Sequence, residues 1–170
     1  MAEADPEQRD ASEQRADGLD LGGERLGVAR AVREEHAVVA RELVRVGVVR
    51  DLIGRVPILG ICLGHQLLAL ASDHTTYKLP FGHRGANHPV LDRATGRVLV
   101  TSQNHGFAVA PSEAREATHV SLYDGTVEGL DFPLEQAQSV QFHPEAGPGP
   151  HDAWPIVEAW VEEVGYAEAA

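Results

Sequence analysis

The segment 60–66 reads Gly-Ile-Cys-Leu-Gly-His-Gln and holds the single cysteine of the chain directly after the apolar run 56–59. A cysteine framed by glycines in the pattern G-x-C-x-G is typical of a nucleophile elbow, a sharp strand-to-helix turn that exposes one side chain. The pattern therefore predicts an α/β fold here and makes the Cys62 thiol a candidate nucleophile. A lone cysteine is more often inert packing, so it is the elbow that favours catalysis.

Composition excludes several classes of protein. A length of 170 residues and a hydrophobic content of 43% suit one folded domain with a core. The net charge of −12 argues against binding to nucleic acid or to an anionic membrane surface. One cysteine forms no internal disulfide, and the sequence shows neither a signal peptide nor a run of membrane-spanning length. We expect a cytoplasmic protein.

The first 55 residues differ in character from the rest, because they contain no aromatic residue and no lysine. Residues 1–20 are polar and charged and are predicted to be a disordered tail. Across 26–53 apolar residues recur at near-helical spacing with charges between them, which predicts a helix.

After residue 55 the pattern is that of an α/β domain. Asp124-Gly125 lies between two short apolar runs and predicts a β-hairpin. The segment 81–90 is rich in glycine, and we expect no regular structure there. The predicted strands are 56–61, 98–102, 119–123, 127–130 and 137–142, and the predicted helices are 64–72 and 154–164.

A catalytic cysteine needs a base, and the base needs a partner that orients it. His143 and Glu145 follow the predicted strand 137–142, just as Cys62 follows its own strand. Neighbouring parallel strands would bring both ends to one edge of a sheet, where ligands bind in open α/β folds. We predict His143 as the base and Glu145 as its partner. By themselves the two residues could equally be a surface ion pair.

Several segments resemble one family in the order expected of it. The elbow with its following helix, and Gln-Phe-His-Pro-Glu at 141–145, resemble class I (triad-type) glutamine amidotransferases. Further motifs look like the small, glutaminase subunit of carbamoyl-phosphate synthetases, at 81–90, 102–109, 121–126 and 144–152. The resemblance runs from about residue 49 to residue 164, so 49–170 is the predicted amidotransferase domain, and it implies a flavodoxin-like α/β fold with a central, mostly parallel sheet.

The resemblance implies the chemistry and the roles of individual residues. Cys62 would attack the side-chain amide of L-glutamine and form a thioester, with His143 and Glu145 completing the triad. The remaining matched positions would bind substrate, and they are Leu63, Gln66, Asn104, Gly106 and Phe107. The backbone N–H of Leu63 would donate to the oxyanion. The ammonia would pass to a large subunit that uses ATP and magnesium to make carbamoyl phosphate for pyrimidine and arginine biosynthesis. This chain itself would hold no cofactor.

The N-terminal segment departs from the family. The Gly/Pro-rich loop that completes the family's oxyanion hole has no counterpart in residues 1–48. We therefore expect the domain to lack its first strands, and hypothesise that 1–48 is foreign to the family through a shifted frame or a misplaced start. Since one oxyanion donor is worth about 10²–10³ in rate, activity would be weak.

Two alternatives remain open from the sequence. The chain could serve another synthetase, such as those for anthranilate or GMP, or be a catalytically inactive relative that only binds a partner. A zinc site is disfavoured, because His83 and His88 lie in a glycine-rich segment and there is no second thiolate.

Overall fold

The computed structural model describes residues 44–110, 116–147 and 149–168. Residues 44–52 are helical, which confirms the last part of the helix predicted over 26–53. The predicted tail 1–20 lies outside the described residues. So do residues 1–43 of the segment that we expect to be foreign to the family, and the domain boundary at residue 49 stays a prediction.

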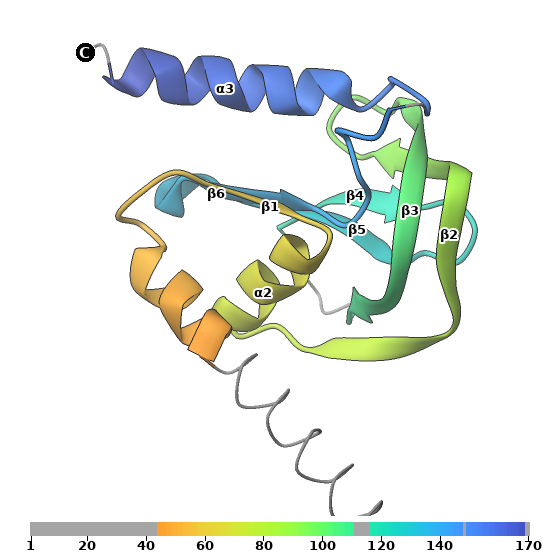
Figure 1. The fold of residues 1–170 in the computed structure, drawn as a ribbon, viewed down its shortest axis with the longest axis horizontal. Coiled ribbons are helices and arrows are strands. Elements are labelled where there is room, and N and C mark those ends of the chain that lie inside the picture. Colours follow the sequence, from red (N-terminus) through yellow and green to blue (C-terminus); the bar gives the residue numbers. More distant parts are fainter. Residues whose placement is uncertain (1–43, 111–115, 148, 169–170) are drawn as a thin grey trace, which may run out of the picture. The chain divides into compact units, whose positions relative to one another are not determined.

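Besides the helical residues 44–52, the described part of the chain forms a six-stranded sheet with helices α2 and α3 (Figure 1). The strands follow the order β1-β6-β5-β3-β2-β4, and β4 also pairs with β5. The elements are β1 Ile58–Ile61, α2 Leu63–Ala71, β2 Thr76–Asp92, β3 Val98–Val109, β4 Ala117–Ser121, β5 Val127–Phe132, a 3₁₀ turn Pro133–Glu135, β6 Ala137–Val140 and α3 Trp154–Glu168.

The strand directions do not confirm a mostly parallel sheet. Only β1 and β6 run parallel, whereas every other described pairing is antiparallel. Because β4 joins both β2 and β5, the strands β2, β3, β5 and β4 close into a ring. Short turns connect β2 to β3, β4 to β5 and β5 to β6, and a short turn can join only antiparallel neighbours.

The prediction that 81–90 is irregular was wrong, because this segment lies within the 17-residue strand β2. Its register against β3 shifts between Lys78 and His83 and again between Gly85 and His88. Gly82 and Gly85 lie at these shifts with φ of 70° and 125°. The glycines therefore mark bulges that bend a continuing strand, which a local pattern does not distinguish from a loop.

The other predicted elements are confirmed with small changes of their ends. The strand predicted at 98–102 extends to Val109, so that the motif around Asn104 also lies on β3. The predicted hairpin is formed by β4 and β5, which pair antiparallel around Asp124-Gly125. The elbow strand, the helix after it, the strand before His143 and the terminal helix are all present.

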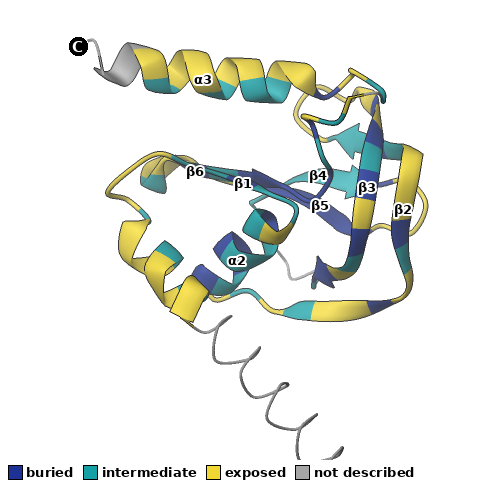
Figure 2. Cartoon of the chain, viewed as in Figure 1, coloured by how far each residue is buried: buried dark blue, intermediate teal, exposed yellow. Residues whose placement is uncertain are grey.

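Two apolar clusters hold the sheet between its helices. On the side of α2, Ala69 packs with Val109, Val127 and Leu130. A second cluster, formed by Val90, Val140, Phe142 and Ala153 with Ile156 packed against it, joins the sheet to the start of α3. Most of β5 is buried (Figure 2). Among the described residues, no helix is long and apolar enough to cross a membrane.

The two glycines of the elbow have different reasons to be glycine. A Cβ on Gly60 would lie 2.7 Å from the carbonyl oxygen of Gly64, because the first turn of α2 folds closely over β1. A Cβ on Gly64 would meet nothing within 4 Å. A side chain at position 60 would therefore meet backbone atoms, and no change of rotamer can relieve that contact.

This asymmetry gives a matched pair of variants. Gly60→Ala is expected to lower the free energy of unfolding by about 1–3 kcal/mol, the usual cost of overpacking a well-packed site. Gly64→Ala should leave it unchanged or raise it, because alanine favours helices over glycine. Thermal and urea unfolding of the two variants measure the difference, and equal effects of both would contradict the close approach.

Candidate active site

Cys62 occupies a strained turn between β1 and α2. Its φ is 52°, a value that few residues other than glycine adopt. Its backbone N–H donates to the carbonyl of Val140 over 2.9 Å, which ties the turn to β6. Such strain persists only where the surrounding structure imposes it, and it clusters at functional sites. The thiol is the single one in the chain, is partly buried, and is free of disulfide bonding.

His143 and Glu145 follow the end of β6 at the same edge of the sheet. Because β1 and β6 are parallel, with Ile61 opposite Val140, both elements run toward this edge. The backbone N–H of His143 donates to Ser102 over 2.9 Å. Its Nδ1 lies 2.7 Å from Oε1 of Glu145. When Nδ1 donates to the carboxylate, Nε2 is left as the nitrogen that accepts a proton.

No hydrogen bond joins the Cys62 sulfur to His143 in the described structure. The sulfur instead lies 4.0 Å from the carbonyl oxygen of Asn104. Contacts between catalytic groups are often loose without substrate and tighten when it binds. The structure thus shows the pair His143–Glu145 formed, and the cysteine beside it but not yet engaged.

The predicted substrate-binding residues lie around the same turn. Gln66, one helical turn after Cys62, donates through Nε2 to the carbonyl oxygen of Phe107 over 3.0 Å. Leu63 and Phe107 are half exposed, at 47% and 49%. Gly106 lies next to Phe107 on β3 and is partly buried. The helix after the elbow and strand β3 therefore face each other across the thiol, whereas the binding roles of these residues stay predictions.

Gln141 is a site residue that the sequence reasoning did not single out. It is fully buried, and its Nε2 lies 3.3 Å from the carbonyl oxygen and 3.8 Å from the sulfur of Cys62. Its Oε1 accepts from Nε2 of Gln66 over 3.1 Å. The signal that could have found it is positional, because Gln141 comes directly after β6, as Cys62 does after β1.

Burial holds the pKa of the Cys62 thiol above its usual value, and the nearby carboxylates Glu145 and Glu128 raise it further. Hydrogen bonds from the backbone of Leu63 and the side chain of Gln141 act in the opposite direction. The thiol is therefore mostly protonated at neutral pH, and a base is needed to make it a nucleophile.

A buried polar cluster lies next to this site. His83, His105 and Glu128 bring ligand atoms within 4.8 Å of one another. However, both nitrogens of His83 and both nitrogens of His105 already have hydrogen-bond partners in the protein. A metal ion would have to displace these partners, so the donor set does not favour one.

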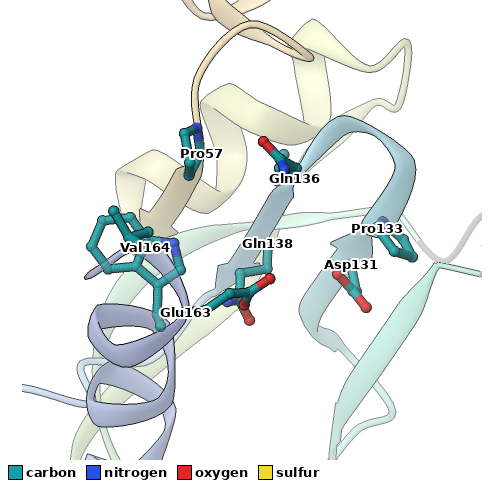
Figure 3. A pocket seen from close by; sticks show the side chains of 9 residues that line it. Pro57, Asp131, Pro133, Gln136, Gln138, Glu163 and Val164 are labelled. Atoms are coloured by element: carbon teal, nitrogen blue, oxygen red, sulfur yellow. The ribbon is translucent and has the colours of Figure 1, made fainter. Parts of the chain in front are cut away.

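A hollow lined by residues of β5, β6 and α3 lies away from this chemistry (Figure 3). It is bordered by Pro57, before β1, and by Ala137 at the start of β6. The predicted catalytic residues follow the opposite ends of these strands, and none of them lines it. This hollow is therefore not the candidate active site.

A cysteine at a strained strand-to-helix turn beside an acid-paired histidine is typical of enzymes that cleave amides through a thioester. Residues 41–162 match the class-I glutamine amidotransferase family. The chain belongs to this family.

Within this family, the chain is similar to carbamoyl phosphate synthase small chains. The chain is 61% identical over 113 residues to a carbamoyl phosphate synthase small chain of Symbiobacterium thermophilum, which covers 63% of this chain and 31% of that protein. It is 56% identical over 117 residues to the small chain of Syntrophotalea carbinolica, over 67% of this chain and 31% of that protein. The chain thus spans about a third of the length of these relatives.

A solved structure supports the fold. A GMP synthase subunit of Thermoplasma acidophilum matches with a TM-score of 0.57 at 20% identity, over 66% of this chain and 59% of that one. At this identity the likeness concerns the fold alone. This likeness supports the class I amidotransferase architecture, even though β1 and β6 are the one parallel pair among the described strands.

The single thiol allows a direct test of its electrostatic surroundings. Glu145→Gln removes a negative charge that disfavours the thiolate, so the pKa of Cys62 should fall. Titration of the thiolate by its ultraviolet absorbance measures this. The matched control is Glu162→Gln, which removes an exposed charge on α3 and should leave the titration unchanged. A higher thiol pKa in Glu145→Gln would contradict the assigned cause.

Proposed function

We propose that this chain is a glutaminase domain that hydrolyses L-glutamine through Cys62, His143 and Glu145. The observation that carries the proposal is the strained elbow at Cys62, beside a histidine held 2.7 Å from a carboxylate at the same sheet edge. The family membership of residues 41–162 supports it independently.

The proposed reaction uses the groups around the elbow in sequence. His143 takes the proton of the thiol, and the sulfur attacks the side-chain amide carbon of glutamine. The developing oxyanion would be stabilised by the backbone N–H of Leu63, which already contacts Cys62. His143 then protonates the leaving ammonia, and water releases glutamate from the thioester. Glu145 orients His143 throughout.

We further propose that the ammonia is used to make carbamoyl phosphate. The similarity to carbamoyl phosphate synthase small chains at 56–61% identity favours this synthetase over those for GMP or anthranilate. A large synthetase subunit would then be the partner, and it is this partner, not the present chain, that would bind ATP and magnesium. Gln66, Asn104, Gly106 and Phe107 would hold the glutamine.

One observation keeps the inactive alternative in view. The thiol is protonated at neutral pH and makes no hydrogen bond to His143 in the described structure. A chain that keeps the triad but does not assemble it would bind a partner without turning over glutamine. Activity separates the two alternatives.

The first experiment measures glutamate release by the purified chain, alone and with a carbamoyl phosphate synthase large subunit, bicarbonate and MgATP. We expect release that Cys62→Ser lowers on the order of 10⁶-fold, as when the nucleophile of a catalytic triad is removed. No release by the folded chain in either condition would leave the inactive relative as the function. Release without carbamoyl phosphate would point to another synthetase.

A further inference from the structure

Glu128 is a fully buried acidic residue near the start of β5. Its Oε2 lies 2.9 Å from the side-chain amide of Gln103, and its Oε1 lies 3.1 Å from Nδ1 of His83. Its backbone carbonyl accepts from the N–H of Gln141 over 2.8 Å. Gln141 in turn contacts Cys62. Glu128 thus contacts β2 and β3 through its side chain, and the end of β6 through its backbone.

A chain of hydrogen bonds leads from this carboxylate to the groups predicted to bind substrate. Gln103 contacts Nε2 of His105 over 2.6 Å, and Nδ1 of His105 donates to the carbonyl oxygen of Phe107 over 2.7 Å. The same carbonyl accepts from Gln66. Glu128 therefore reaches the thiol's surroundings along two routes, one through Gln141 and one through Gln103.

The other carboxyl oxygen of Glu128, Oε1, faces the imidazole of His83. His83 lies between Glu128 and Asp124, with Nε2 3.0 Å from Oδ2 of Asp124. These two carboxylates raise the pKa of His83 to about 9, and Thr126 and His83 help to lower the pKa of Asp124 to about 2. Two further imidazoles lie against His83, with ring centroids at 4.8 Å for His105 and 5.2 Å for His88. A cationic His83 thus keeps the carboxylate from being an unpaired buried charge.

The hydrogen bonds that link the Phe107 carbonyl through His105 and Gln103 to Glu128 fix how many protons His105 and Glu128 carry together. The carbonyl of Phe107 only accepts, so Nδ1 of His105 carries a hydrogen. The amide of Gln103 offers a donor at one end and an acceptor at the other, and which end faces His105 is an assignment. In one orientation His105 must be an imidazolium, and in the other Glu128 must be protonated. Either way, His105 and Glu128 together hold one proton more than a neutral imidazole and a carboxylate.

Burial disfavours charge on both members of this pair. It lowers the pKa of His105 to about 4 and raises the pKa of Glu128. In the second orientation Glu128 donates to Gln103, and Gln103 donates to His105. A glutamine at position 128 can make the same donation without any titratable proton.

Building on the proposed function, we propose that Glu128 is a positioning residue for the glutamine site. It acts through Gln103 and His105 on the Phe107 carbonyl and Gln66, and through its backbone on Gln141. Without the side chain, the Phe107 carbonyl loses the support that fixes it against Gln66. Glutamine binding then weakens, whereas the thiol itself stays in place, because the β1–β6 pairing and the elbow are untouched.

The test measures how L-glutamine protects Cys62 from alkylation by iodoacetamide, which requires no turnover. The glutamine concentration that halves the alkylation rate reports binding, and the rate without glutamine reports the thiol. Glu128→Leu should raise the half-protecting concentration about tenfold, the size of one hydrogen bond to a buried polar group. Glu128→Gln should stay near the unaltered chain. Both variants lack the carboxyl group, so their alkylation rates without glutamine should agree with each other.

Two further variants keep the test decisive. Gln103→Met interrupts the route but leaves the pair Glu128–His83, so it replaces Glu128→Leu if that variant does not fold, with the same expected weakening. Ser121→Ala removes a buried hydroxyl that accepts from Tyr123 outside the route, and should not change protection. The proposal is overturned if Glu128→Gln or Ser121→Ala weakens glutamine binding as much as Glu128→Leu does. It is also overturned if glutamine protects Glu128→Leu and Gln103→Met as well as it protects the unaltered chain. Absence of protection in the unaltered chain, with alkylation intact, would overturn the proposed function instead.

Discussion

The parallel pairing of β1 with β6 is the constraint on which the site depends. It sets Ile61 opposite Val140, so that Cys62 and Gln141 leave the sheet side by side. The hydrogen bond from the backbone of Cys62 to Val140 then fixes the turn, and the close approach of Gly60 to α2 leaves it no room to relax. A positive φ at a residue with a side chain is tolerated because neighbours on both sides impose it.

Two structural units meet at this site, and β5 belongs to both. The ring of β2, β3, β5 and β4 carries the segment around Asn104 and Phe107, whereas β1, α2 and β6 carry the thiol, Gln66 and the strand leading to His143. The pairings of β5 with β3, β4 and β6 join the units through the backbone. Within the ring, the side chain of Glu128 ties β5 to β2 and β3 through polar contacts that are buried and therefore sensitive to loss of any one partner.

Sequence patterns predict the parts of this structure that are decided locally. The elbow, the Asp124-Gly125 hairpin and the pair His143–Glu145 are each encoded within a few residues, and all are formed. The path of β2 is not local, because its glycines serve as bulges only when β3 lies alongside. Gln141 and Glu128 were missed for a related reason. Their contacts come from strands far apart in the chain, and each residue type alone would suit an ordinary strand.

The β1–β6 pair also joins segments that are among the most distant in the described sequence, with the whole strand ring between them. Pairings of this kind carry a high cost in loop-closure entropy and contribute little to the local stability of the ring. β1 is also short and has one partner strand in the described sheet. The candidate active site is therefore tied to a contact that can open while the ring stays folded. In such a protein, heat or denaturant would take this site apart before the bulk of the β-structure melts.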